Sequence, residues 1–234
     1  MSAIRSTYRR MRWAVHRAIG RDVRFPVQTR VRSERHGSDA GEWWICPDGL
    51  GPSAIVYSFG IGTDITFDLS LIRAYGLTVH AFDPTPGAIA YVERQQLPPG
   101  FEAHSVGVAS RDGRATFFPP ENPSHISHTL LRRPETSARA IEVEVRRLST
   151  IMRELRHESI DVLKMDIEGA EYEVLDEILD RGLAVRQILV EFHHRFPAVG
   201  IDRTRQAVRA LNEAGYKIFF AAESGEEYSF IRQD

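Results

Sequence analysis

The feature that most constrains the fold of this chain is an alternation of short apolar segments with segments of helical periodicity, which begins at Ala54. Gly76 and Gly215 end two of the helical segments, as glycines commonly do. Strands that alternate with helices form a parallel sheet with helices on both faces. We therefore expect strands over 54–59, 77–82, 101–109, 160–167 and 185–192, and helices over 64–75, 86–95, 148–156, 170–181 and 202–214.

The end of the chain departs from this parallel pattern. Two further strands, over 217–222 and 227–232, are separated only by a short turn, so we expect them to pair antiparallel. Earlier in the chain, Asp112 and Gly113 form a tight turn into an apolar segment over 114–118, which predicts a hairpin with the preceding strand. The expected fold is α/β, with a mostly parallel seven-stranded sheet and an antiparallel terminal strand.

Charge is strongly segregated along the chain. Residues 1–36 contain ten arginines but only Asp22 and Glu34 as acids, a local balance of +8, so the remainder carries −10 to reach the net charge of −2. Apolar residues recur within this basic region at the spacing of an amphipathic helix. They are Ile4, Tyr8, Met11, Val15 and Ile19. Such a helix could pack on its own domain or on the partner subunit of a homodimer, lie on an anionic membrane, or bind nucleic acid. The acidic remainder argues against nucleic acid.

Length and composition predict one soluble domain. The 234 residues suffice for one sizeable core, and we expect a basic helix and connector over 1–42 followed by a single domain over 43–234. No apolar run approaches the roughly 20 residues of a membrane span. No apolar segment follows the N-terminal arginines as in a secretory signal. The single cysteine, Cys46, cannot form an internal disulfide. These features favour a cytoplasmic location.

Two glycines and one acid occupy positions where open α/β sheets bind ligands, beyond the carboxyl ends of the strands. Gly60 and Gly62 follow the first strand, where a missing side chain lets backbone amides approach a ligand at the start of a helix. Asp83 ends the second strand, 21 residues after Gly62, where a carboxylate can accept hydrogen bonds from both hydroxyls of an adenosine ribose. The pattern predicts an adenosine-containing cofactor, although the glycines alone would also suit a simple turn.

Three segments at these strand ends resemble the FkbM-like family of S-adenosylmethionine-dependent methyltransferases in order and spacing. They are residues 56–64 (VYSFGIGTD), 81–85 (AFDPT) and 163–171 (LKMDIEGAE). The resemblance covers about residues 43–192 and implies a Rossmann-like class I methyltransferase fold with S-adenosyl-L-methionine as cofactor. It further implies that Gly60 and Gly62 contact the methionine portion and that Asp83 holds the ribose.

The chain also departs from the common methyltransferase pattern. Ser58 stands where the first strand commonly carries an acid, and Asp64 replaces the third glycine. We expect Ser58 to contact the cofactor from this position. Asp64 could hydrogen-bond the amino group of the cofactor or cap the following helix. We also expect Pro84, next to the ribose-binding acid, and Ser105 and Val106, after the third strand, to border the cofactor.

Carboxylates and histidines gather at the ends of the next two strands. They are Asp166 and Glu168 at one, and Glu191, His193 and His194 at the other. Methyl transfer to a hydroxyl is aided by a group that removes its proton or by a divalent ion that lowers its pKa. Glu191 lies in an apolar strand, where a charge is costly unless it is paired or liganding, whereas Asp166 and Glu168 could instead cap a helix. Alternation places His193 on the face of Glu191 and His194 on the other, so we expect at most one of the two to be catalytic.

A polar loop over 119–134 supplies a further catalytic candidate, His125. Long loops often carry functional residues, although exposed histidines are also common in them. If a metal takes part, the oxygen and imidazole ligands of Asp166, Glu191 and His193 would suit Mg²⁺ or Mn²⁺.

The sequence thus predicts an enzyme that moves a methyl group from S-adenosyl-L-methionine to a hydroxyl of a saccharide or a similar polyhydroxylated small molecule. The saccharide follows from the histidine-rich loop and from the likeness to bacterial sugar O-methyltransferases. The preference for arginine over lysine is typical of a GC-rich genome, such as an actinobacterial one. A natural-product hydroxyl and a non-catalytic nucleotide-binding regulatory module are the alternatives. An NAD-dependent oxidoreductase is disfavoured because the chain lacks a full G-x-G-x-x-G loop.

Overall fold

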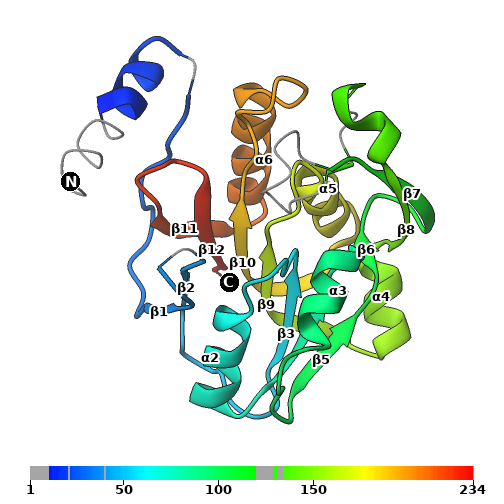
Figure 1. The fold of residues 1–234 in the computed structure, drawn as a ribbon. Helices are drawn as coiled ribbons and strands as arrows, with labels where there is room; N and C mark the ends of the chain where they lie inside the picture. The colour runs from blue at the N-terminus through cyan, green and yellow to red at the C-terminus, as the bar shows by residue number, and fades with distance from the viewer. Residues whose placement is uncertain (1–10, 21, 40, 120–128, 131–133, 234) are drawn as a thin grey trace, which may run out of the picture.

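A seven-stranded sheet forms the centre of the fold (Figure 1). The computed structural model describes residues 11–20, 22–39, 41–119, 129–130 and 134–233. The strand order is β11-β12-β10-β9-β3-β4-β5. The strands are β3 (Ile55–Phe59), β4 (Thr78–Phe82), β5 (Phe101–His104), β9 (Ser159–Met165), β10 (Ala184–Glu191), β11 (Tyr216–Ala221) and β12 (Glu227–Arg232). β12 runs antiparallel to both of its neighbours, and the other adjacent pairs are parallel, which confirms the predicted sheet.

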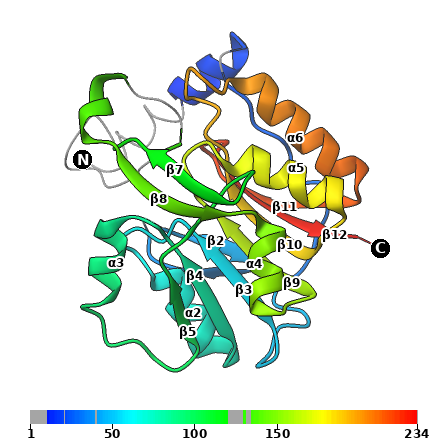
Figure 2. The ribbon, with the colours of Figure 1, turned by 90° about the vertical axis from the view of Figure 1, so that its right-hand side faces the viewer.

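Helices cover both faces of the sheet because alternate strand residues point to opposite sides. The helices are α2 (Thr66–Tyr75), α3 (Pro86–Val92), α4 (Leu148–Leu155), α5 (Glu171–Arg181) and α6 (Ile201–Glu213). In β3, Tyr57 and Phe59 belong to the apolar core shared with α4, α5 and α6. Val56, between them, belongs to the core shared with α2 and α3. In Figure 2, α4 and α5 lie in front of the sheet and α2 lies behind it. The arrangement is the expected Rossmann-like fold of class I methyltransferases.

The region between β5 and β9 differs from the prediction. The expected strand over 101–109 ends at His104, and a separate three-stranded sheet follows, in the order β6-β8-β7. Its strands are β6 (Gly107–Val108), β7 (Gly113–Phe117) and β8 (Ile141–Arg146), and the 3₁₀ helix η1 (Pro134–Arg139) precedes β8. The predicted hairpin is wrong because β8 inserts between β6 and β7, where its Val143 and Val145 share a small apolar cluster with Ala115 and Phe117. Figures 1 and 2 both show this small sheet beside α5.

Residues 22–33 pack along the β11 side of the sheet (Figure 1), where the N–H groups of Gln28 and Thr29 donate to the carbonyl of Ile218. Strands β1 (Glu34–His36) and β2 (Trp43–Ile45) pair antiparallel. β1 lies in the segment that we expected to be a connector, and β2 lies at the start of the expected domain. A helix covers residues 11–18, with Trp13 buried but Met11, Val15 and Ile19 exposed. No helix among the described residues is both long enough and apolar enough to cross a bilayer.

Candidate active site

A cavity of about 230 Å³ lies at the carboxyl ends of β3, β4 and β9 and is lined by the glycine loop after β3. Gly60 has a left-handed backbone, with φ of 74°. A Cβ atom at this position would lie 1.7 Å from the carbonyl oxygen of Asp166. Glycine is therefore required here because the loops after β3 and β9 approach each other closely.

Asp83 is held rigidly at the wall of this first cavity. Its Oδ2 accepts a hydrogen bond from the backbone N–H of Gly62 (3.0 Å), and its Oδ1 accepts bonds from the N–H (2.9 Å) and hydroxyl (2.6 Å) of Thr85. Oδ2, which accepts one bond, retains acceptor capacity for a ligand hydroxyl, whereas Oδ1 already accepts two. Sequence analysis did not single out Thr85, although its position two residues after an acid is typical of a local turn.

Of the other residues expected to bind the cofactor, some line the first cavity and others lie outside it. Asp64 and Pro84 line the first cavity. The Oδ1 atom of Asp64 also accepts hydrogen bonds from the N–H and hydroxyl of Thr66, the first residue of α2. Ser58 is fully buried in β3 and does not line the cavity. Ser105 lines a separate cavity of about 160 Å³, and Val106 packs against the core.

Lys164, in β9, anchors the glycine loop, and sequence analysis did not recognise this role. Its ammonium donates hydrogen bonds to the carbonyl oxygens of Phe59 (3.1 Å) and Gly60 (2.8 Å), and it lies 5.6 Å from the centre of the Trp43 ring. Burial raises the pKa of the nearby Asp68 to about 6, and Lys164 opposes this rise. The available signal was a lysine inside an apolar strand of a chain that has only one other lysine.

We expect Lys164→Met to lower the melting temperature and to weaken binding of S-adenosylhomocysteine. The substitution leaves two carbonyls without their charged donor, a loss of about 1.5–3 kcal/mol. For a domain of this size that corresponds to roughly 3–12 °C. Lys217→Met is the matched control, because Lys217 donates only to the carbonyl of Asn212 (3.2 Å), remote from the loop. Equal effects of the two substitutions on ligand affinity would contradict the anchoring role.

The residues expected to react come together beyond β9 and β10. One ligand atom each from Asp166, Glu191 and His193 lies within 4.8 Å of the other two. Nε2 of His193 is 3.7 Å from Oδ1 of Asp166 and 3.9 Å from Oε2 of Glu168. Glu171, which we did not single out as a site residue, accepts a hydrogen bond from the backbone N–H of His193 (2.8 Å), and the same oxygen lies 3.3 Å from Nδ1 of the ring. Glu171 thereby turns Nε2 of His193 toward Asp166.

Carboxylates outnumber cations in this group. Burial, and then the neighbouring Asp166, raise the pKa of Glu191 to about 9. Burial lowers the pKa of His193, but Glu171, Glu191 and Glu168 outweigh it and raise that pKa to about 10. The cluster thus favours binding of a proton or of another cation.

The remaining two candidates lie elsewhere. His194 is buried on the opposite side of the chain from His193, with its Nε2 2.7 Å from Oδ1 of Asp22. His125 lies outside the described residues.

A second, larger cavity of about 610 Å³ adjoins the reacting group. Asp166 lines both cavities, whereas Glu191 lines only the second. The second cavity also contains four aromatic side chains, which are Trp13, Trp43, Trp44 and Phe220, and seven carboxylates in all. The sequence alone did not connect these aromatic residues, because they come from the N-terminal helix, β2 and β11.

Comparison with known proteins identifies the family. Residues 55–218 match the sequence model described as "Methyltransferase FkbM domain". The chain is 28% identical over 191 residues to Homo sapiens "Probable methyltransferase-like protein 24" and 27% identical over 200 residues to the Rattus norvegicus protein of that name. These matches cover 76% and 77% of this chain but only 46% and 48% of the two relatives, so the chain spans about half their length. The crystal structure of methyltransferase FkbM from Methylobacillus flagellatus KT aligns with a TM-score of 0.48 and 12% identity, over 78% of this chain and 44% of that one. On the match of its sequence to the family model, this chain belongs to the FkbM methyltransferase domain family.

Proposed function

We propose that the chain is an S-adenosyl-L-methionine-dependent O-methyltransferase whose acceptor is a hydroxyl of a carbohydrate or a similar polyhydroxylated molecule. The observation that carries the proposal is the position of Asp166, which lines both cavities. We assign the cofactor to the first cavity and the acceptor to the second. Asp166 then lies where the two reactants meet.

The chain's own residues perform binding and proton removal in this mechanism. S-adenosyl-L-methionine, when bound, supplies an electrophilic methyl group. The rigid carboxylate of Asp83 accepts a hydrogen bond from a ribose hydroxyl through Oδ2, and the loop of Gly60 and Gly62 borders the methionine portion. Glu191, Asp166 and His193 surround the acceptor hydroxyl, and an unprotonated atom among them takes its proton as the methyl group passes from the cofactor's sulfur to the acceptor oxygen. Holding both reactants in place supplies much of the rate acceleration.

The lining of the second cavity supports a polyhydroxylated acceptor. Aromatic rings such as those of Trp13, Trp43 and Trp44 offer flat apolar faces against which the C–H faces of a sugar ring can pack. Carboxylates such as Glu226 and Glu227 accept hydrogen bonds from hydroxyl groups.

The deciding experiment incubates the protein with methyl-labelled cofactor and a panel of saccharides, and locates the label by mass spectrometry and NMR. Transfer to aromatic or polyketide hydroxyls, with none to any saccharide, would favour the natural-product alternative; no transfer at all despite cofactor binding would favour the regulatory module.

We expect S-adenosylhomocysteine to raise the melting temperature by binding the folded state, and NAD to have no such effect. Asp83→Asn should weaken binding of S-adenosylhomocysteine about 10- to 100-fold, because the charged acceptor of a ribose hydroxyl is lost. Calorimetric titration measures both affinities. Asp161→Asn is the matched control, because this carboxylate also accepts a backbone hydrogen bond (Ile55 N–H, 2.9 Å) but lies at the opposite end of β3. Unchanged affinity in Asp83→Asn would reject the ribose assignment.

The proposal extends to a divalent ion at the reacting group. Asp166, Glu191 and His193 offer the oxygen and imidazole donors that Mg²⁺ and Mn²⁺ accept, and their excess of negative charge favours a cation. Such an ion lowers the pKa of a coordinated hydroxyl. We expect EDTA to reduce turnover and added Mg²⁺ or Mn²⁺ to restore it. Full turnover after verified removal of metal would reject the ion and leave the acid–base mechanism.

A further inference from the structure

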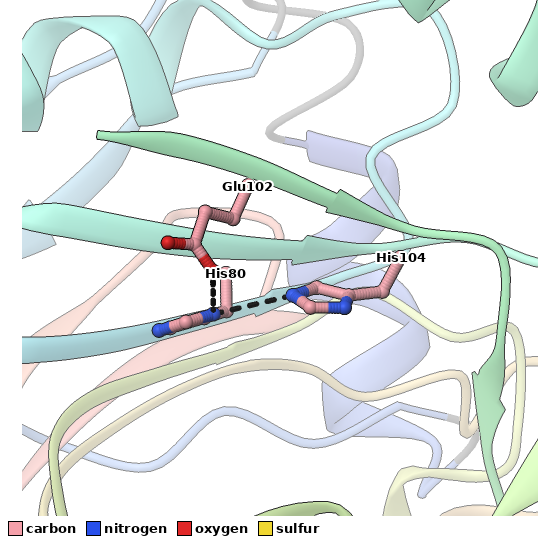
Figure 3. Close-up of side chains that lie close together, drawn as sticks. All are labelled: His80, Glu102 and His104. Atoms are coloured by element: carbon pink, nitrogen blue, oxygen red, sulfur yellow. Dashed lines mark hydrogen bonds and ion pairs between the residues drawn. The ribbon is translucent and has the colours of Figure 1, made fainter. Parts of the chain in front are cut away.

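Two histidines and a glutamate converge on neighbouring strands, outside the lining of both proposed reactant cavities (Figure 3). His80 of β4 lies directly opposite Glu102 of β5, and Phe82 lies opposite His104. Residues two apart on a strand share a face, so His80, Glu102 and His104 all project to the same side of the sheet. β5 is the edge strand of the sheet, and the group links it to β4.

Two distances between the donor atoms are about 0.1–0.2 Å shorter than those of a tetrahedral metal site. Nδ1 of His80 is 3.1 Å from Oε2 of Glu102 and 3.2 Å from Nε2 of His104. In a tetrahedral zinc site with bonds of about 2.0–2.2 Å, neighbouring ligand atoms lie about 3.3–3.6 Å apart. We propose that His80, Glu102 and His104 bind a zinc ion through these three atoms, with water in the fourth position.

The chemistry of the three groups favours zinc over magnesium. Two imidazoles with one carboxylate form a mixed nitrogen and oxygen set that Zn²⁺ accepts, whereas Mg²⁺ prefers oxygen ligands alone. The side chain of Glu102 is 55% exposed, which gives an ion access from solvent.

The neighbours of the group indicate a structural role for the ion. The ring of His104 stacks on Phe82 at 4.5 Å, and Phe82 stacks on Phe59 at 4.4 Å. Both phenylalanines line the first cavity. An ion that joins β4 to β5 would therefore hold the wall behind the proposed cofactor site, without contact to the reacting group.

The test uses full-length protein without a histidine tag, freed of metal by chelation. Co²⁺ serves as the first probe, because tetrahedral Co²⁺ absorbs visible light through d–d transitions, and displacement by Zn²⁺ then gives the zinc affinity. We expect this absorption without a thiolate band, since the single cysteine, Cys46, is not in the group. Glu102→Gln and His104→Gln should each weaken zinc binding by at least about 10- to 100-fold. Zinc should raise the melting temperature of the wild-type protein more than that of Glu102→Gln.

Two controls separate this site from the reacting group. Glu191→Gln and His193→Gln alter the second possible ligand set, which can also take Co²⁺, and should leave intact the part of the Co²⁺ spectrum and the zinc affinity that Glu102→Gln removes. Circular dichroism checks the fold of each variant, and Glu102→Gln keeps the test valid if the His104 variant unfolds, because Glu102 is exposed. Three results would overturn the proposal: no zinc binding by the wild-type protein, zinc binding that Glu102→Gln does not weaken, or zinc binding that is lost only in the Glu191 and His193 variants. The contacts among His80, Glu102 and His104 would then be hydrogen bonds alone.

Discussion

Glu191→Gln is expected to reduce turnover by about 100- to 10,000-fold while cofactor affinity and melting temperature stay close to those of the wild-type protein. The substitution keeps the shape of the side chain but removes a carboxylate from the second cavity and from the group that contains Asp166 and His193. In its ionised form Glu191 can take the proton of the acceptor or hold an ion there, and the amide can do neither. Steady-state kinetics, calorimetric titration with S-adenosylhomocysteine and thermal denaturation separate these effects.

Glu177→Gln is the matched control for this prediction. Glu177 is also a buried carboxylate, but it accepts hydrogen bonds from the backbone N–H (3.0 Å) of Leu148 and from the hydroxyl of Ser149 at the start of α4. Its substitution should lower the stability by about 1–3 kcal/mol and leave the turnover of the folded protein unchanged. Normal turnover by folded Glu191→Gln would show that the chemistry takes place elsewhere.

Gly60→Ala should lower the stability more than a glycine-to-alanine substitution at any other glycine that lines the first cavity. The new Cβ would overlap the carbonyl oxygen of Asp166, and alanine is strained at φ of 74°. Overlap and strain together should cost about 3 kcal/mol or more. This corresponds to a fall in melting temperature of roughly 6–12 °C. Because relief of the overlap displaces Asp166, turnover and cofactor affinity should fall as well.

Gly182→Ala provides the comparison. Gly182 ends α5 with φ of 61°, but a Cβ atom there would meet no atom within 4 Å. Alanine should therefore cost only the conformational strain, about 1 kcal/mol, and leave activity intact. If the two variants are equally stable, close contact between the loops after β3 and β9 is not what requires glycine at position 60.

The strands and helices of the main sheet could be predicted because each has a local signature. The burial of β3 and β10 produces the apolar segments from which they were predicted, and β12 lies close in sequence to its partner β11. The end of each strand was predictable in the same way. Since parallel strands end at one edge of a sheet, Asp166 and Glu191 were expected to lie close together, and the structure brings them together with His193.

By itself, then, the sequence determined the strands and helices of the main sheet, their alternation and the edge of the sheet at which its polar residues collect. Only the tertiary structure decided which distant segments meet. β8 inserts between β6 and β7, Lys164 reaches the carbonyl of Gly60, and Trp13 from the N-terminal helix lines the same cavity as Glu191. His80 and His104 meet because β4 and β5 pair in one particular register. Periodicity records which face of an element is buried, but not which neighbour buries it, because a strand or helix can pack its apolar face against any complementary surface.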